Sequence, residues 1–374
     1  MMMTTRQLHE FCRIVQGGRS GHSGNDFVPE GIPAYGAGGL NGYLPNYEFD
    51  EPAVILSSIG ARCGKCFCVT GKWASLANTQ LIFPDLEEAD IRFIWFQLND
   101  EKRWYRSGTG QPFIKPSDVK AHRVFLPPLS EQRRIAQILG KADALRTRRR
   151  AMLAQLDELS RSIFLDMFGE PAMNSKGWSC HLLSELILVG PQNGLYRPGT
   201  DYGSGTPILR IDGFYDGEVS NLRMLKRLRV SGAETDLFGL VEGDIVINRV
   251  NSREFLGKSA LIPALPEPTV FESNMMRIRV DTARIAPGYL IQYLQTSFVR
   301  SQILRAAKDA VNQSSINQQD VKRLEVLLPP IELQEQFVNR IGKIGQIRAC
   351  GTLAFRESDA LFASLQHRAF RGEL

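Results

Sequence analysis

The acidic residues Asp85 and Asp100 are the strongest candidates for catalytic chemistry in this chain. Pro84-Asp85 is followed by Asp100-Glu-Lys102, a loose proline-acid, acid-x-lysine pattern in which paired carboxylates would hold Mg²⁺ and activate water. In metal-dependent nucleases the acid-x-lysine lies on a strand, whereas here it follows residues 93–100, whose pattern indicates a helix. We favour a helix terminus with solvated charges, and keep a metal-dependent DNA endonuclease as an alternative hypothesis.

Other chemical motifs fail on their spacing. Residues 257–259 (GKS) are similar to the end of a phosphate-binding loop, but that loop needs a glycine five residues earlier, where Ser252 stands. Cys63, Cys66 and Cys68 lack the second Cys or His pair of a zinc ribbon. Both Pro-Pro pairs follow Leu, unlike the Asn/Asp-Pro-Pro-aromatic loop of an adenine methyltransferase. We therefore predict a non-catalytic chain with no metal and no cofactor of its own.

Length and composition limit the class of protein. The 374 residues correspond to two domains or slightly more, and 43% hydrophobic residues are enough to bury a core in each. No apolar run approaches the roughly 18 residues of a membrane-spanning helix, and the first residues lack a signal-peptide pattern. We expect a cytoplasmic protein without a membrane partner. The net charge of +5 permits a nucleic-acid partner without requiring one.

An internal repeat organises the chain. Residues 111–146 align without a gap to residues 313–348, an offset of 313 − 111 = 202, and 13 of the 36 positions are identical. Both copies contain Leu-Pro-Pro, at 126–128 and 328–330. A period of this length is far too long for a solenoid, so it indicates a duplicated domain followed by a helix.

The upstream parts of the two halves share a pattern of strands. In each half a strand-like run, 53–57 or 244–248, leads to a Gly-Lys pair, and an asparagine precedes a second alternating run. Period-two apolar runs punctuated by glycine predict a half-buried sheet. The matching residues are Gly64-Lys65 with Gly257-Lys258, and Asn78 with Asn274. A helical pattern follows at 91–106 and 287–307, so we predict an α+β domain, then a helix, twice over.

The segment 130–168 has the clearest helical periodicity. Ser130 can cap it, and Gly169 with Pro171 can end it. Two heptad positions predict a coiled-coil seam about 58 Å long, formed by Ile135, Ala142, Arg149, Leu156 and Ile163, and by Ile138, Leu145, Met152 and Leu159. The second copy, from Glu332, is the expected partner helix. Cys350-Gly351-Thr352 interrupts its apolar pattern and predicts a stutter or bend.

A duplicated sheet domain, ending each time in Leu-Pro-Pro before a long helix with Gln132 or Gln334, resembles the DNA-specificity subunit of type I restriction-modification systems. The resemblance covers nearly the whole chain, although Leu333 stands where the first copy has Glu131. It implies an α+β fold with two similar mixed α/β target-recognition domains, separated by long helices that pair as an antiparallel coiled coil, and a pseudo-twofold internal repeat. The domains would be 1–129 and 171–331, and the spacer helices 130–170 and 332–374.

The resemblance also implies a function. The chain would bind double-stranded DNA with a split recognition sequence and recruit two methyltransferase subunits and, conditionally, restriction/translocase subunits. S-adenosylmethionine, ATP and Mg²⁺ would reside on those partners. A protein scaffold is the other alternative, and it predicts no salt-dependent affinity for DNA.

The side chains suited to DNA lie in corresponding loops of the two halves. Arg reads guanine, Asn and Gln read adenine, and Lys, Ser and Thr position phosphates. In the first domain we predict DNA contacts from Arg19, Ser20, His22, Ser57, Ser58, Arg62, Lys65, Gly110, Gln111 and Lys115. In the second we predict them from Tyr196, Arg197, Arg210, Asn248, Arg249, Asn251, Arg253, Lys258, Asn312, Gln313 and Asn317.

The spacer helices carry the predicted subunit interface. Its residues are Gln132, Ile135, Ile138, Leu145, Met152, Leu156, Leu159, Gln334, Phe337, Ile344 and Ile347. The basic run 146–150 could meet phosphate, but on a coiled coil such a run is more often a solvated face or a subunit contact.

Overall fold

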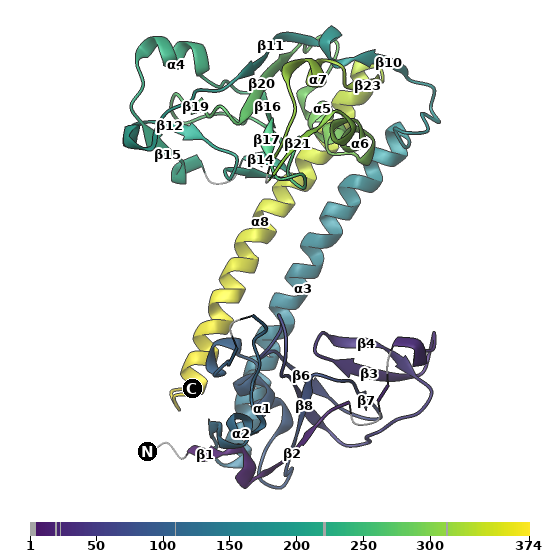
Figure 1. Ribbon diagram of the computed structural model, residues 1–374, viewed down its shortest axis with the longest axis vertical. Helices are drawn as coiled ribbons and strands as arrows, with labels where there is room; N and C mark the ends of the chain where they lie inside the picture. The colour runs from purple at the N-terminus through teal and green to yellow at the C-terminus, as the bar shows by residue number, and fades with distance from the viewer. Residues whose placement is uncertain (1–4, 19–20, 23, 109, 220–221, 312) are drawn as a thin grey trace. The chain divides into compact units, whose positions relative to one another are not determined.

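The computed structural model describes the chain except residues 1–4, 19–20, 23, 109, 220–221 and 312 (Figure 1). It divides into two compact units, one formed by Met1–Leu153 with Cys350–Leu374 and the other by Ala154–Ala349. Each unit holds one mixed α/β domain and parts of the long helices α3 (Leu129–Phe168) and α8 (Ile331–Ala369). The predicted α+β class with two similar domains and two long helices is confirmed.

The first unit is built on a four-stranded antiparallel sheet in the order β2-β8-β5-β6. These strands are β2 (Cys12–Gln16), β8 (Thr79–Pro84), β5 (Ala53–Ser57) and β6 (Cys66–Val69). Beside it lie the sheet β4-β3-β7, formed by β3 (Ile32–Gly36), β4 (Gly39–Leu44) and β7 (Ala74–Ser75), and the pair β1 (Thr5–Gln7) with β9 (Arg123–Phe125). The helices are α1 (Ile91–Leu98) and α2 (Pro116–Ala121).

The core of the first unit lies between this sheet, α1 and the end of α8. All residues of β5 and β8 are buried, so the half-buried sheet predicted from the period-two pattern is wrong for these two strands, which are covered on both faces. Phe93 and Phe96 of α1 contact Phe370 and Phe362, with ring centroids 5.8 and 6.0 Å apart. The last turns of the chain are therefore part of the core of the first domain.

The second unit repeats this plan in a larger form. Its main sheet has the order β11-β20-β16-β18-β14-β13, formed by β11 (Ile187–Asn193), β20 (Met275–Val280), β16 (Ile245–Asn248), β18 (Ser259–Leu261), β14 (Gly217–Val219) and β13 (Phe214–Tyr215). Smaller sheets join β15 (Lys226–Leu228), β12 (Tyr202–Leu209) and β19 (Val270–Phe271), then β17 (Val250–Asn251), β22 (Gln313–Ser315) and β21 (Lys308–Ala310), and the pair β10 (Ser179–Leu182) with β23 (Glu325–Leu328). The helices are α4 (Gly232–Phe238), α5 (Pro287–Leu294), α6 (Ser297–Ala306) and α7 (Gln318–Lys322).

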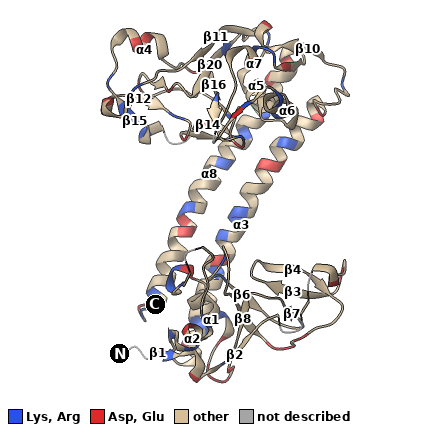
Figure 2. Cartoon of the chain, in the orientation of Figure 1, with Lys and Arg blue, Asp and Glu red and all other residues tan. Residues whose placement is uncertain are grey.

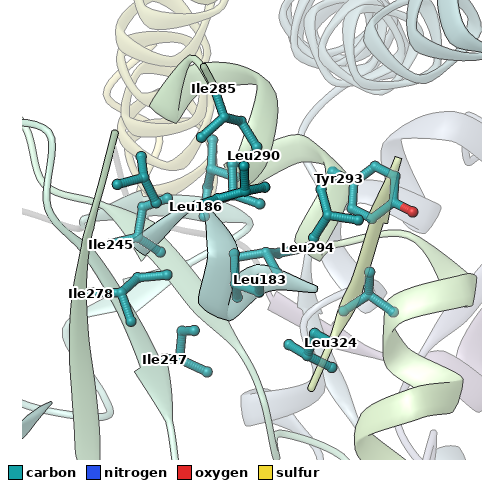
Figure 3. Packing of buried hydrophobic residues seen from close by; sticks show 14 of the residues in the cluster. Leu183, Leu186, Ile245, Ile247, Ile278, Ile285, Leu290, Tyr293, Leu294 and Leu324 are labelled. Atoms are coloured by element: carbon teal, nitrogen blue, oxygen red, sulfur yellow. The ribbon is translucent and has the colours of Figure 1, made fainter. Parts of the chain in front are cut away.

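The core of the second unit is the counterpart of the first. Figure 3 shows Leu290 and Leu294 of α5 near Ile245, Ile247 and Ile278 of β16 and β20. The long helices complete this core with aromatic rings, because Phe164 and Phe168 of α3 both make edge-to-face contacts with Phe337 of α8. Phe337 is fully buried, as a residue of a helix interface should be.

The prediction of a bend at Gly351 is wrong, because α8 runs without interruption from Ile331 to Ala369. Gly351 is buried against α3, and a Cβ placed on it would lie 2.7 Å from Met152 Cε and 3.1 Å from Leu153 Cδ2. The glycine therefore allows the two helices to approach closely, and tertiary packing outweighs its low helix propensity.

Within the first unit, two arginines of α3 contact α8. Arg149 donates hydrogen bonds to the Ala354 carbonyl and the buried Ser358 hydroxyl. The Arg146 guanidinium lies 3.8 Å from the centroid of the Phe362 ring. Because residue numbers rise on α3 as they fall on α8, the helices are antiparallel here. Figure 2 shows Lys and Arg interspersed with Asp and Glu along both helices.

The predicted coiled-coil seam on α3 is covered at one of its two heptad positions and mostly exposed at the other. Leu145, Met152 and Leu159 are 41, 37 and 46% exposed, and Ile347 is 54% exposed. Ile135, Phe337 and Ile344 are buried, Ile138 and Leu156 are half-buried, and Gln132 and Gln334 are fully buried. The long stems of Arg146 and Arg149 cover apolar surface of α8, so a second leucine stripe stays at the surface.

Candidate nucleic-acid interface

The end of β5 in the first unit forms a tightly bonded loop. Ser57 N–H donates to Lys65 O and Gly64 N–H donates to Ser57 O, both over 2.8 Å. Ser58 N–H donates to Asn78 O over 3.0 Å. Gly64 and Asn78 have φ of +96° and +65°, the left-handed region that glycine and asparagine tolerate best. The glycine and the asparagine identified by pattern thus hold this loop in shape.

The end of β16 in the second unit has the same framework. Asn248 N–H donates to Lys258 O over 2.8 Å, and Gly257 N–H donates to Asn248 O over 3.0 Å. Arg249 N–H donates to Asn274 O over 2.9 Å. The Gly-Lys pairs and asparagines therefore occupy equivalent places in the two units, as the sequence pattern predicted. What differs is the side chain that each framework presents.

In the first unit the predicted DNA-contacting residues lie at different depths. The side chains of Ser57 and Ser58 are buried, at 0 and 6% exposure, so only their backbone is part of the loop surface. Arg62 donates to the Gly38 carbonyl over 2.7 Å. The exposed members are Arg62, Gly110, Gln111 and Lys115, and the half-buried ones are His22 and Lys65. Arg19 and Ser20 lie outside the described residues.

In the second unit several arginines are held by carboxylates. Arg253 is ion-paired with Asp309, whose pKa is lowered, mainly by a hydrogen bond from Ser314. Arg197 is ion-paired with Glu234. These pairs orient the guanidinium groups, which can exchange a carboxylate for a phosphate or a base edge.

Arg249 and Lys258 are anchored to the backbone. Arg249 Nη1 donates to Ser273 O over 3.2 Å, and Lys258 Nζ donates to Ile211 O over 2.7 Å. Lys258 Nζ also lies 3.8 Å from the centroid of the Tyr215 ring, and burial lowers its pKa. Lys258 is thus largely engaged within the domain.

The remaining predicted residues of the second unit have varied surroundings. Asn317 caps α7, since its Oδ1 accepts from Gln319 N–H over 2.8 Å and from Asp320 N–H over 3.1 Å. Asn248 is buried, Asn251 is half-buried, and Gln313 and Tyr196 are exposed. Asn312 lies outside the described residues.

Sequence reasoning did not single out the carboxylates that hold these arginines. Glu234, Glu272 and Asp309 lie 37 to 62 positions from Arg197, Arg210 and Arg253, respectively. No local pattern signals such pairs, because their partners meet only through the fold.

The acid-x-lysine segment does not form a metal centre. Lys102 lies in the 3-10 turn Glu101–Arg103, not on a strand, and Asp100 Oδ1 caps this turn by accepting from Lys102 N–H over 3.1 Å. Asp85 Oδ1 accepts from Glu87 N–H over 3.0 Å. Among the described residues, no group of three His, Cys, Asp or Glu side chains could hold a metal ion. This geometry matches the helix terminus that the pattern favoured.

The thiols of Cys63 and Cys66 are buried and face backbone carbonyls. Cys63 Sγ lies 3.4 Å from Ser58 O, and Cys66 Sγ lies 3.3 Å from Leu98 O. Burial raises the pKa of both thiols, which disfavours the thiolate that binds zinc. In the part of the chain that the structure describes, no helix combines the length and hydropathy needed to cross a membrane.

Comparisons with known proteins agree on one family. Residues 2–155 match the model of the type I restriction modification DNA specificity domain. The putative type I restriction enzyme MjaX specificity subunit of Methanocaldococcus jannaschii is 33% identical over 177 residues, 45% of this chain and 41% of that protein. The EcoKI specificity subunit of Escherichia coli K12 is 28% identical over 279 residues, 70% of this chain and 60% of that protein. The matched regions thus span about half the length of these relatives.

A solved structure has the same fold over nearly the whole chain. The type I restriction-modification S subunit from M. genitalium superposes with a TM-score of 0.66, covering 98% of this chain and 96% of that one at 14% identity. This identity supports the fold alone. The matched specificity domain and the curated relatives show that the chain is similar to type I restriction-modification specificity subunits.

Proposed function

We propose that this chain is the non-catalytic, sequence-reading subunit of a type I restriction-modification complex and binds double-stranded DNA with a split recognition sequence. One observation carries the proposal. The same backbone framework occurs at the ends of β5 and β16, but it holds the buried Ser58 in one unit and the half-buried Arg249 at the equivalent place in the other. A shared framework with different side chains suits two domains that bind DNA alike and read different half-sequences.

Exposed apolar side chains on the long helices support subunit docking. Leu145 and Met152 are seven residues apart on α3, and on α8 Leu353 and Leu361 are 61 and 50% exposed. Apolar residues at helical spacing on a surface are typical of an interaction site. We assign this surface to two methyltransferase subunits and, where present, restriction/translocase subunits, with S-adenosylmethionine, ATP and Mg²⁺ on those partners. A solved relative at 16% identity comes from work on complex assembly of the type I restriction-modification system.

Methylome sequencing of cells with and without the gene tests the proposal most directly. We expect N6-methyladenine at a single bipartite motif, lost when the gene is deleted. The purified full chain should bind DNA with that motif, and its affinity should fall as salt rises, because bound cations are released from the phosphates. An unchanged methylome would overturn the proposal, and so would methylation or cleavage by the purified chain alone.

The docking surface has its own test. Leu145→Glu with Leu159→Glu, two exposed leucines of α3, should abolish co-purification of the methyltransferase subunits, because it places charge in an apolar contact. Gln137→Glu, an exposed position on the same helix, is the matched control and should leave assembly intact. Assembly that survives the double substitution would place the interface elsewhere.

A further inference from the structure

The second unit contains a cavity of about 450 Å³ lined by polar and aromatic side chains. Its lining includes Tyr196, Tyr202, Arg210, Glu272 and Asn274. Tyr196 is 78% exposed. The volume falls in the range of roughly 300–1,000 Å³ that is typical of sites for small organic groups.

A buried ion pair forms part of this cavity. Glu272 is 8% exposed, and its Oε1 accepts from Ile211 N–H over 2.6 Å. Its Oε2 lies 3.7 Å from Arg210 Nε, beyond hydrogen-bond distance. Within the described chain Arg210 Nε is buried without a hydrogen-bond partner. The guanidinium and the carboxylate therefore keep hydrogen-bonding capacity for a ligand.

The pair has no counterpart in the first unit. Glu272 is the first residue after β19, and its N–H donates to Leu209 O at the end of β12. In the first unit Leu76 is the first residue after β7, and its N–H donates in the same way to Tyr35 O of β3. By this match Leu76 takes the place of Glu272, and Gly36 takes the place of Arg210. Two domains with one framework therefore differ here in the chemistry they offer.

The cavity adjoins the loop framework at the end of β16. Ser273, which lines the cavity, accepts a hydrogen bond from Arg249 through its carbonyl. Ile211, whose N–H is bonded to Glu272, accepts one from Lys258 through its carbonyl. The cavity is thus continuous with the surface that we assign to the DNA of the second half-sequence.

The charges favour a neutral ligand over a phosphate. The cations of the cavity are Arg197, Arg210 and Lys226, and they face the carboxylates Asp201, Asp212, Glu234 and Glu272. A balanced set of donors and acceptors, bordered by two tyrosines, complements the edge and face of a nucleobase. A phosphate would meet the buried carboxylate of Glu272 and be repelled.

We propose that this cavity binds one nucleobase of the second half-sequence, turned out of the duplex, with Arg210 and Glu272 reading its edge and a tyrosine stacking on its face. The proposal rests on the function proposed above. Turning one base out of the stack costs free energy, which the contacts in the cavity would offset. The first domain, with Gly36 and Leu76 at the matching places, reads its half-sequence without such a site.

The test uses the full chain with its methyltransferase subunits, and duplexes that carry the motif identified by methylome sequencing. A fluorescent base analogue, 2-aminopurine for purines or pyrrolocytosine for cytosine, replaces each suitable base of both half-sequences in turn. Apart from the methylated adenines, which the methyltransferase subunits themselves turn out, we expect a several-fold change in fluorescence at one position of the second half-sequence and at none of the first. Arg210→Ala should abolish this signal and reduce discrimination at that base roughly tenfold or more.

Glu272→Gln keeps a carbonyl oxygen for Ile211 N–H and should weaken discrimination at the same base alone. Arg227→Ala is the matched control, because Arg227 is an exposed arginine ion-paired with Glu267 near the cavity. It should leave signal and discrimination unchanged. Unaltered recognition of the first half-sequence verifies that each variant is folded.

Two results would overturn this inference while leaving the proposed function intact. One is specific binding with no change in fluorescence at any position other than the methylated adenines. The other is binding of free nucleoside monophosphates, without DNA, that Arg210→Ala abolishes, because the cavity would then serve a free nucleotide. Loss of all specific binding in the unsubstituted complex would instead refute the proposed function itself.

Discussion

Gln132 and Gln334 make the same three hydrogen bonds in the two units. Gln132 Oε1 accepts from Asp90 N–H over 2.9 Å, as Gln334 Oε1 does from Ala286 N–H. Gln132 Nε2 donates to the carbonyls of Glu88 and Pro127, and Gln334 Nε2 donates to those of Arg284 and Pro329. Both side chains are fully buried. Each glutamine thus ties a long helix to the loop before α1 or α5 and to its Leu-Pro-Pro motif.

Removing either glutamine side chain should therefore loosen one domain. Gln132→Leu leaves three backbone groups without their side-chain partner, so we expect the free energy of unfolding of the first unit to fall by about 1–3 kcal/mol. Urea denaturation with hydrogen exchange of β5 and α1 measures this. Gln137→Leu, at an exposed position one turn further along α3, is the control. Equal stability of the two variants would show that the bonded network contributes nothing.

Gly351 should tolerate a methyl group better than a larger side chain. In Gly351→Ala the added methyl group contacts the flexible end of Met152, and alanine has the higher helix propensity. The free energy of unfolding should therefore change little. Gly351→Leu should cost about 1–3 kcal/mol, because overpacking forces α3 and α8 apart. Gly342, around which nothing lies within 4 Å of an added Cβ, is the control site. There alanine should stabilise α8 by about 0.5–1 kcal/mol in thermal unfolding. A neutral Gly351→Leu would refute the close approach.

The two half-sequences should be separable by mutation. Replacing Arg249 and Arg253 with Ala should weaken recognition of the second half-sequence by about 1–3 kcal/mol for each true base contact, and leave the first unchanged. Fluorescence anisotropy on duplexes with single-base changes measures this. If affinity falls equally on every DNA, these arginines bind phosphates instead.

Asp309 should restrain the DNA affinity of the second unit. Its carboxylate pairs with Arg253, and both side chains are 56% exposed, so DNA must compete with it for the guanidinium. Asp309→Asn should raise affinity modestly and make the dependence on salt concentration steeper. Glu267→Gln, which releases Arg227 instead, should leave specific binding unchanged. A decrease in affinity for Asp309→Asn would mean that this pair positions Arg253 for binding.

The long helices are predicted to set the length of the unspecified gap in the target. Seven residues inserted into α3 after Leu153, with seven more into α8 before Cys350, keep the helix pairing in phase and add about 10 Å. The gap should then lengthen by up to about three base pairs, or binding should fail because the domains rotate relative to the groove. Methylome sequencing reads the result. A change in the half-sequences at constant gap would refute this role.

The sequence by itself determined the parts that depend on local order. Apolar runs at period two predicted β5, β8, β16 and β20, and the offset of 202 residues predicted the repeat. The structure begins α3 at Leu129 and ends it at Phe168, close to the predicted 130–168. Each of these features is encoded by neighbouring residues, since hydrophobic periodicity and turn residues act over a few positions.

Only the tertiary structure decided which face of each element is covered and which charges meet. Leu145, Met152 and Leu159 recur at heptad spacing on α3 yet stay exposed, whereas Arg149 of the other heptad position contacts α8. Glu272 comes to Arg210 across 62 residues, and Ser57 and Asn248 are buried although their residue types suit a surface loop. Burial and ion pairing are collective properties, because they depend on segments far apart in the chain that meet only when the domain closes around them.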